Sequence, residues 1–480
     1  MSDRPRAAVV EQRVRQSVRV GVRVAVAVGA WALAGAVHSA SPSSPVSQAS
    51  APSPASAAAT VEPVAAPALS AAAGERAFAQ ARTRLVQVRT LLRSQDSQSS
   101  VGSGFLVSDE GHLISNYHVV SQFALRPGEH RLVYTAADGR QGALQLLAVD
   151  VVNDLALLRP VEAEPLKAQG HLSFRPAEVP LQRGERIFAL GNPLDVGFAV
   201  VEGVYNGLVE RSFVPTLFFG GSLSSGMSGG PAIDDQGRVI GINVASRRDG
   251  EQVSFLVPSA AAEALLARGR AQTPVSRPLH DELTRQILQH QQALTDAFVA
   301  QSWRKVAHAG YDIPVPQEVF LRCWGSSSPG ETRGLRFERS DCVTDHRVFV
   351  SGSLLTGHLS VRHETYDGRS LGMLRFAQRH AASFANEGFR RPPRHLTPPR
   401  CHEGQIDRGG LPLRTVMCLW AYRELPGLYD ASVLVATLGG RDRGAQGRFD
   451  VAGVSHDNAQ RLARHYLSGW TPTSTARTAP

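Results

Sequence analysis

The sequence predicts a mainly β protein, and three observations support this fold class. From Thr83 onward the chain contains apolar runs of four to eight residues, rich in Val, Leu, Ile and Phe and bounded by Gly, Asp or Pro. Such runs are typical of the strands of an antiparallel barrel or sandwich. Strand-like runs return after Glu318, and the four cysteines of the chain lie among them. We therefore expect an all-β domain followed by a disulfide-bearing α+β domain.

Length and composition indicate a globular protein of two or three domains. The chain has 480 residues, of which 42% are hydrophobic and 19% charged, as in ordinary folded proteins. The formal net charge is +9, but residues 1–40 hold six arginines and two acidic residues and so account for +4 of it. The remaining basic residues form no runs, so we expect no nucleic-acid partner.

The N-terminal 40 residues have the pattern of an export signal. Arginines precede the uncharged stretch VAVAVGAWALAGAV at 24–37, and small residues follow it. This stretch is shorter than the roughly 20 residues that a membrane-spanning helix needs, which favours a signal peptide. An uncleaved N-terminal anchor is the alternative, and it is the only membrane contact that we expect. Either interpretation predicts a periplasmic or secreted protein.

Residues 41–74 are predicted to form a linker. They are almost entirely Ala, Ser, Pro and Val, with Glu62 as the one charged residue. Such a composition cannot bury enough surface to offset the entropy of ordering the chain.

Three polar residues stand next to apolar strand ends in the predicted β domain. They are His118 in ISNYHVV, Asp154 in VVNDLALL and Ser228 in SSGMSGGPAI. Hydrolysis by a serine needs a base for the hydroxyl proton, a carboxylate that orients this base, and amide donors for the oxyanion. Gly226 and the two glycines after Ser228 allow backbone N–H groups to face that oxyanion. Each residue alone is a weak signal, since an isolated His or Asp is more often structural.

The order of these residues distinguishes two hydrolase folds. GMSGG also fits the G-x-S-x-G turn of α/β-hydrolases, in which a helix follows the serine and the acid and histidine come later in the chain. Here PAIDDQGRVIGINVAS after Ser228 alternates like two strands around a tight turn, and both partners precede the serine. The order His118, Asp154, Ser228 is the chymotrypsin-type order.

Residues 83–270 resemble a trypsin-like serine peptidase of the bacterial HtrA (Deg) branch. The matching stretches are GSGFLVSDEGHLISNYHVV, DLALL, ALGNP, VVEGVYNGLVE, GMSGGPAID, GRVIGINVAS and VSFLVPS. The resemblance implies a chymotrypsin-like double antiparallel β-barrel with six strands in each barrel. It implies His118 as general base and acid, Asp154 as its orienting carboxylate and Ser228 as nucleophile, with the amides of Gly226 and Ser228 as the oxyanion hole. No metal and no organic cofactor is implied.

Two positions near the serine bear on activation and specificity. Met227 stands where many relatives have Asn or Asp. No carboxylate is therefore available there to pair with the new N-terminus that cleavage creates in trypsin-type zymogens, so we expect no activation by N-terminal processing. Ser222, six residues before Ser228, is at the position that often forms the base of the primary specificity pocket in this fold. Because it carries no charge, we expect a preference for a small or medium uncharged side chain rather than Arg or Lys.

The peptidase domain is predicted to cover residues 75–272 and to close with a helix capped by Ser259. A long helix is predicted over 280–307, as a docking or linker helix in preference to a coiled coil because Gln291 interrupts its apolar stripe. It opens a C-terminal α+β domain, residues 280–472, with further helices near 374–386 and 455–467. HtrA relatives usually carry PDZ modules at this position, but no copy of the PDZ carboxylate-binding loop is recognisable.

The four cysteines are expected to form two disulfides in an oxidising compartment. Three connectivities are possible, and the most local one joins Cys323 with Cys342 and Cys401 with Cys418. A zinc site is the alternative, although no C-x-x-C pair prepares a tetrahedral site. Three aromatic residues of this region, Trp324, Trp420 and Tyr422, are expected in its core.

The sequence as a whole predicts an exported serine endopeptidase that acts on proteins or peptides through an acyl-enzyme, in envelope protein processing or quality control. The alternative is a binding or scaffold protein on a peptidase fold, whose C-terminal domain recognises an envelope partner. An esterase that uses the same three residues is a third interpretation.

Overall fold

The computed structural model describes residues 68–246, 253–308, 310–329, 334–385, 392 and 394–473. All of them belong to one compact unit, Ala65–Pro480. The predicted export signal and most of the predicted linker lie outside the described residues. No helix in the described part is both long and apolar enough to cross a membrane.

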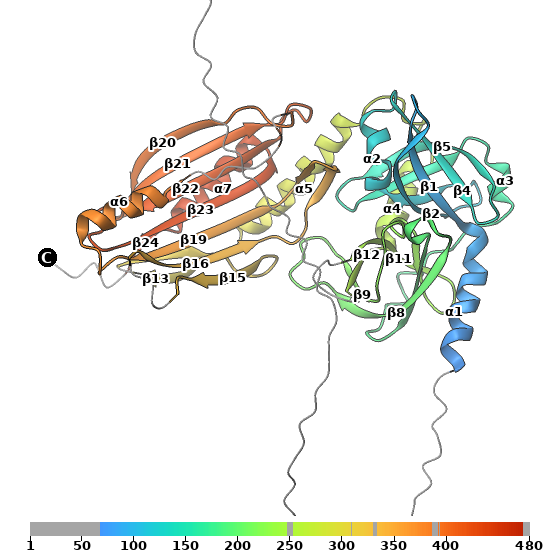
Figure 1. Cartoon of the computed structure of the whole chain (residues 1–480), viewed down its shortest axis with the longest axis horizontal. Helices are drawn as coiled ribbons and strands as arrows, with labels where there is room; N and C mark the ends of the chain where they lie inside the picture. The colour runs from blue at the N-terminus through green and yellow to red at the C-terminus, as the bar shows by residue number, and fades with distance from the viewer. Residues whose placement is uncertain are drawn as a thin grey trace, which may run out of the picture. The chain divides into compact units, whose positions relative to one another are not determined.

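The first half of this unit folds into two closed antiparallel barrels of six strands each (Figure 1), which confirms the predicted fold class. The first barrel has the order β1-β2-β3-β6-β5-β4, with β1 Leu85–Leu92, β2 Ser97–Leu106, β3 Leu113–Asn116, β4 His130–Ala136, β5 Gln141–Asp150 and β6 Leu155–Pro160. The second has the order β10-β11-β12-β9-β8-β7, with β7 Arg186–Gly191, β8 Ala199–Leu208, β9 Leu217–Gly220, β10 Pro231–Ile233, β11 Val239–Ser246 and β12 Ser254–Pro258.

Two of the hairpins close with tight turns. The amide of Gly111 donates to the carbonyl of Ser108 at 3.1 Å, and the amide of Gly237 donates to that of Asp234 at 2.9 Å. Short helical turns complete the connections: η1 Arg82–Arg84, α3 Glu164–Lys167 and η2 Pro193–Asp195.

Three longer helices pack on the barrels. Helix α1 (Ala68–Ala81) begins inside the stretch predicted as linker, because its alanines favour a helix and Ala77 and Ala81 are buried against Phe188. Helix α2 (Tyr117–Leu125) follows β3 directly, and α4 (Ser259–Gly269) closes the second barrel. The predicted cap on α4 is wrong, because the residue that precedes the helix is Pro258 and no side chain caps it.

Helix α5 (His280–Val299) ends eight residues before the predicted boundary, because Arg304–His308 forms strand β13 instead. Its first turns place Leu283 and Ile287 in the core of the first barrel. Its last turns place Leu294 and Phe298 in the core of the C-terminal sheet. The predicted interruption, Gln291, is 1% exposed. The helix therefore docks along its whole length, as the docking interpretation predicts.

The C-terminal region is built on a seven-stranded antiparallel sheet with the order β15-β16-β19-β23-β22-β21-β20 (Figure 1). The strands are β15 Arg322–Ser327, β16 Arg336–Val343, β19 Leu359–Asp367, β20 Arg400–Asp407, β21 Pro412–Ala421, β22 Tyr429–Thr437 and β23 Arg443–Val454. A small sheet joins β13, β14 (Tyr311–Val315) and β24 (Thr471–Pro472), and a hairpin joins β17 (Val348–Ser351) and β18 (Leu354–Thr356).

Helix α7 (His456–Ser468) packs on β22 and β23 beside α5, and helix α6 (Met373–Ser383) lies near its predicted position. Trp420 and Tyr422 are buried as expected, whereas the prediction for Trp324 is wrong because its side chain is 56% exposed. Trp324 lies on β15, which is an edge strand and has one neighbour only.

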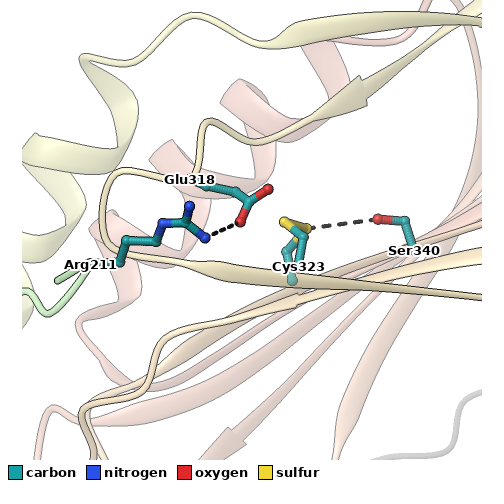
Figure 2. The surroundings of a disulfide bond; sticks show 5 residues. Arg211, Glu318, Cys323 and Ser340 are labelled. Atoms are coloured by element: carbon teal, nitrogen blue, oxygen red, sulfur yellow. Dashed lines mark hydrogen bonds and ion pairs between the residues drawn. A yellow bond between two sulfur atoms is a disulfide. The ribbon is translucent and has the colours of Figure 1, made fainter. Parts of the chain in front are cut away.

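The disulfides join residues that face each other on neighbouring strands at the two edges of the large sheet. Cys323 on β15 is bonded to Cys342 on β16, and Cys401 on β20 to Cys418 on β21. This is the most local of the predicted connectivities, and it leaves none of the four as a thiolate ligand for zinc. Figure 2 shows the first bridge, with the Ser340 hydroxyl beside its sulfur and the ion pair of Arg211 and Glu318 nearby. Each bridge closes a short loop, which constrains the unfolded chain and stabilises the fold by about 3 kcal/mol.

Candidate active site

The side chain of His118 is held by Asp154 from the facing turn of the first barrel. The Nδ1 atom of His118 lies 2.6 Å from Oδ2 of Asp154, and the backbone N–H of His118 donates to Oδ1 at 2.8 Å. The backbone carbonyl of Asp154 also accepts hydrogen bonds from the amide of Tyr117 and the side-chain amide of Asn116. Asp154 therefore satisfies two N–H groups at the start of α2 and also orients the imidazole ring.

Local structure explains how Asp154 reaches the histidine. The residue lies in the turn between β5 and β6 with a φ of 55°, a left-handed conformation that Asp tolerates better than most residues. In this conformation its carboxylate and its carbonyl both reach the N-terminus of α2.

Two opposing effects set the pKa of His118. Burial disfavours the imidazolium and lowers the pKa, whereas the negative charge of Asp154 and its hydrogen bond raise it. The net result is a pKa above the ordinary value of 6.5. A ring held in this way can take up and release a proton near neutral pH.

Ser228 lies in a loop of the second barrel that only glycines permit. Gly226 and Gly229 have φ values of 93° and 86°, and a Cβ at either position would come within 2.4 Å of a backbone oxygen. The carbonyl of Ser228 accepts the amide of Ser103 at 2.7 Å, which ties this loop to the first barrel. Its hydroxyl donates to the carbonyl of Val244 at 3.0 Å.

Two amide N–H groups near Ser228 are available to an oxyanion as donors. Within the described part of the chain, neither the amide of Gly226 nor that of Ser228 donates a hydrogen bond to another protein group. Met227 between them is 1% exposed and packs with Ile187, Ala189 and Leu223 in the core of the second barrel. An apolar residue at this position therefore serves packing.

Ser222 is exposed and lines none of the described cavities. A cavity of about 430 Å³ instead lies next to Asp154 and Val244. Among the described residues, no group of three or more His, Cys, Asp or Glu side chains could hold a metal ion.

Phe349, from β17 of the C-terminal region, contributes to this cavity and was missed by sequence reasoning. Its ring meets that of His118 edge to face, with centroids 6.0 Å apart. The surrounding pattern RVFVSGSLL alternates like any half-buried strand, so no local signal marks this residue.

Comparison with known proteins assigns the barrel domain. The family model described as a trypsin-like peptidase domain matches residues 102–242. The putative serine protease HhoB of Synechocystis is 31% identical over 194 residues, which are 37% of this chain and 43% of the relative. A probable periplasmic serine endoprotease, DegP-like, of Marinomonas is 30% identical over 192 residues, 38% of each protein.

Some matches extend further: the serine protease Do-like HtrA of Bacillus subtilis is 27% identical over 266 residues, 51% of this chain and 54% of the relative. The chain thus spans about half or less of the length of these relatives. The two closed barrels and these matches lead to one assignment: the barrels carry a trypsin-like peptidase domain, which is similar to HtrA-like and DegP-like serine proteases over part of their length.

Proposed function

We propose that the whole chain is an exported serine endopeptidase of the bacterial envelope that hydrolyses proteins or peptides with His118, Asp154 and Ser228. The observation that carries this proposal is the pair of hydrogen bonds that the Asp154 carboxylate accepts from the ring and the backbone of His118. A carboxylate in this position fixes the tautomer of the imidazole and stabilises the imidazolium that forms during catalysis.

The proposed reaction has two steps. The Ser228 hydroxyl leaves the Val244 carbonyl, transfers its proton to Nε2 of His118 and attacks the carbonyl carbon of the substrate. The amides of Gly226 and Ser228 donate to the oxyanion, and His118 returns the proton to the departing amine. Water then attacks the acyl-enzyme in the same way, so that the carboxylic acid is released and Ser228 regains its proton.

The envelope location is supported by the basic and apolar N-terminal pattern, by the disulfides of the C-terminal region, and by the periplasmic relative. Disulfides persist in oxidising compartments and are rare in the cytosol.

Replacement of Ser228 tests the proposal. In Ser228→Ala, we expect casein cleavage to disappear and a fluorophosphonate probe no longer to label the protein, because the nucleophilic oxygen is absent. Ser224→Ala is the matched control, since Ser224 is exposed in the same loop and should keep both signals. If the unaltered chain neither cleaves casein nor reacts with the probe, the proposal fails and a binding or scaffold role takes its place.

A further inference from the structure

A segment of the C-terminal region, Asp345–Val350, lies against the first barrel beside His118. The hydroxyl of Tyr117, the residue before His118, donates to the carbonyl of Val350 at 2.9 Å, and this hydrogen bond is buried. The ring of Phe349 contacts the rings of both Tyr117 and His118. On the other side of the segment, Nε2 of His346 lies 3.0 Å from the carbonyl of Val152. The segment is therefore fixed at two points on the barrel.

This segment forms one wall of the cavity of about 430 Å³ next to Asp154. The barrels supply the other walls, which are mainly apolar and include Val214, Val244 and Phe255. The cavity is linked to Ser228 through one lining residue, Val244, whose carbonyl accepts the serine hydroxyl. Its volume and apolar lining match those of sites that bind one or a few side chains.

The rim of the cavity carries one positive charge that has no counter-ion. Arg347 is exposed and makes no ion pair with any described residue. The neighbouring Asp345 is bound to Arg322 at 2.6 Å and cannot neutralise it fully. An unpaired guanidinium at the edge of an apolar cavity attracts a carboxylate from a ligand that fills the cavity.

We propose that Phe349 and Arg347 form a substrate subsite of the peptidase, which selects a bulky apolar side chain and a nearby acidic side chain at fixed positions beside the scissile bond. The apolar side chain fills the cavity against Phe349, and the acidic one pairs with Arg347. The C-terminal region thereby takes part in substrate selection. This inference rests on the proposed function, because the cavity is a subsite only if Ser228 is the nucleophile.

Matched peptides and the full chain provide the test. Two fluorogenic peptides share a sequence that the protein cleaves, selected from a peptide library. They differ only at the position proposed to pair with Arg347, which is Glu in one peptide and Lys in the other. We expect the unaltered protein to prefer the Glu peptide by about fivefold in kcat/KM, as for an exposed ion pair. Arg347→Glu should reverse this preference, whereas Arg375→Glu, a charge reversal at an exposed position of α6, should keep it.

Phe349 is tested with a second pair of variants. In Phe349→Ala, the preference for a bulky over a small apolar side chain should fall about tenfold, whereas Phe349→Leu should retain most of it. The leucine variant also shows whether a loss in the alanine variant is due to misfolding.

The outcomes separate the subsite from the catalytic assignment. If the fluorophosphonate probe labels Ser228 in Arg347→Glu and the variant still prefers the Glu peptide, the subsite is refuted while the proposed function stands. If the unaltered protein is not labelled, the proposed function itself fails.

Discussion

At the scale of single residues, Asp154 has two functions in the candidate site. Its carboxylate orients the His118 ring and binds the His118 amide, and its carbonyl accepts the amide of Tyr117. One residue thus sets both the start of α2 and the direction of the imidazole. An Asn at this position would fit the left-handed backbone equally well, so the charge can be removed without disturbing the turn.

We therefore expect Asp154→Asn to fold normally and to lose kcat by about 10³ to 10⁴-fold, because the neutral amide neither fixes the tautomer nor stabilises the imidazolium. The pH profile adds a second readout. In the proposed reaction His118 must be neutral to act as a base, so we expect activity to fall as the pH drops through its pKa, which lies above 6.5 in this structure. Without the negative charge, this pKa falls and the acid limb of the profile moves to lower pH.

Steady-state kinetics on a peptide substrate between pH 4 and 9 measure both effects. Asp138→Asn, the same exchange in the exposed turn between β4 and β5, is the control and should leave rate and profile unchanged. An Asp154→Asn protein with full activity would rule out Asp154 as the orienting carboxylate.

At the scale of secondary-structure elements, α5 connects the first barrel to the C-terminal sheet. Beside its apolar residues it contributes Gln286, which is 8% exposed. The Oε1 atom of Gln286 accepts the amide of Val151 at 2.8 Å, and its Nε2 atom donates to the carbonyl of Val149 at 2.9 Å. Val149 lies near the end of β5, and Val151 is the first residue of the turn that holds Asp154.

Gln286→Ala leaves two buried backbone groups without these partners. We expect the free energy of unfolding to fall by about 1–3 kcal/mol, the usual cost of an unsatisfied buried polar group. Urea denaturation followed by circular dichroism measures this change. Gln289→Ala, an exposed position one turn further along α5, serves as control and should change stability little. Equal stability of the two variants would show that this contact does not hold α5 to the barrel.

The barrel strands could be predicted from the sequence more completely than the end of α5 or the contacts of the C-terminal region. The barrel strands were predictable because each apolar run and its turn form a local pattern, and the three polar residues stood beside strand ends. The end of α5 was missed, because the residues after Val299 leave the helix to pair as β13 and β14, a tertiary interaction that overrides local preference. Phe349 and Arg347 were missed for the same reason, since only the docking of β17 on α2 brings Phe349 to His118 and Arg347 to the cavity next to Asp154.

At the scale of the whole molecule, both halves of the described chain bury histidines in a neutral state. Burial lowers the pKa of His363 to about 3, and burial together with the neighbouring His346 lowers that of His290 to about 4. Burial also lowers the pKa of His112, His308, His346, His380 and His465. The described histidine His118 instead has a raised pKa.

These shifts determine how stability depends on pH. Above about pH 6.5 each of these histidines is neutral in both the folded and the unfolded state, so none of them affects stability. As the pH falls below 6.5, the unfolded chain binds protons that the folded chain excludes, and the free energy of unfolding decreases. His118 acts in the opposite direction, because its raised pKa adds stability below 6.5, but it is one residue against seven. We therefore expect the protein to lose stability between pH 7.5 and 5.

His363 is the sharpest test of this prediction, because its side chain is 4% exposed and bonds only to the hydroxyl of Tyr466 among the described residues, at 3.2 Å. With a folded pKa of about 3, it should account for about 2 kcal/mol of the stability lost between pH 7.5 and 5. Urea denaturation at pH 7.5 and at pH 5 measures how far the free energy of unfolding falls between the two values. This decrease should be smaller in His363→Gln than in the unaltered protein by that amount. His402→Gln, which is exposed on β20, should show the same loss as the unaltered protein. If the loss in His363→Gln is equally large, His363 is not excluded from protonation in the folded state, and the acid sensitivity must come from other groups.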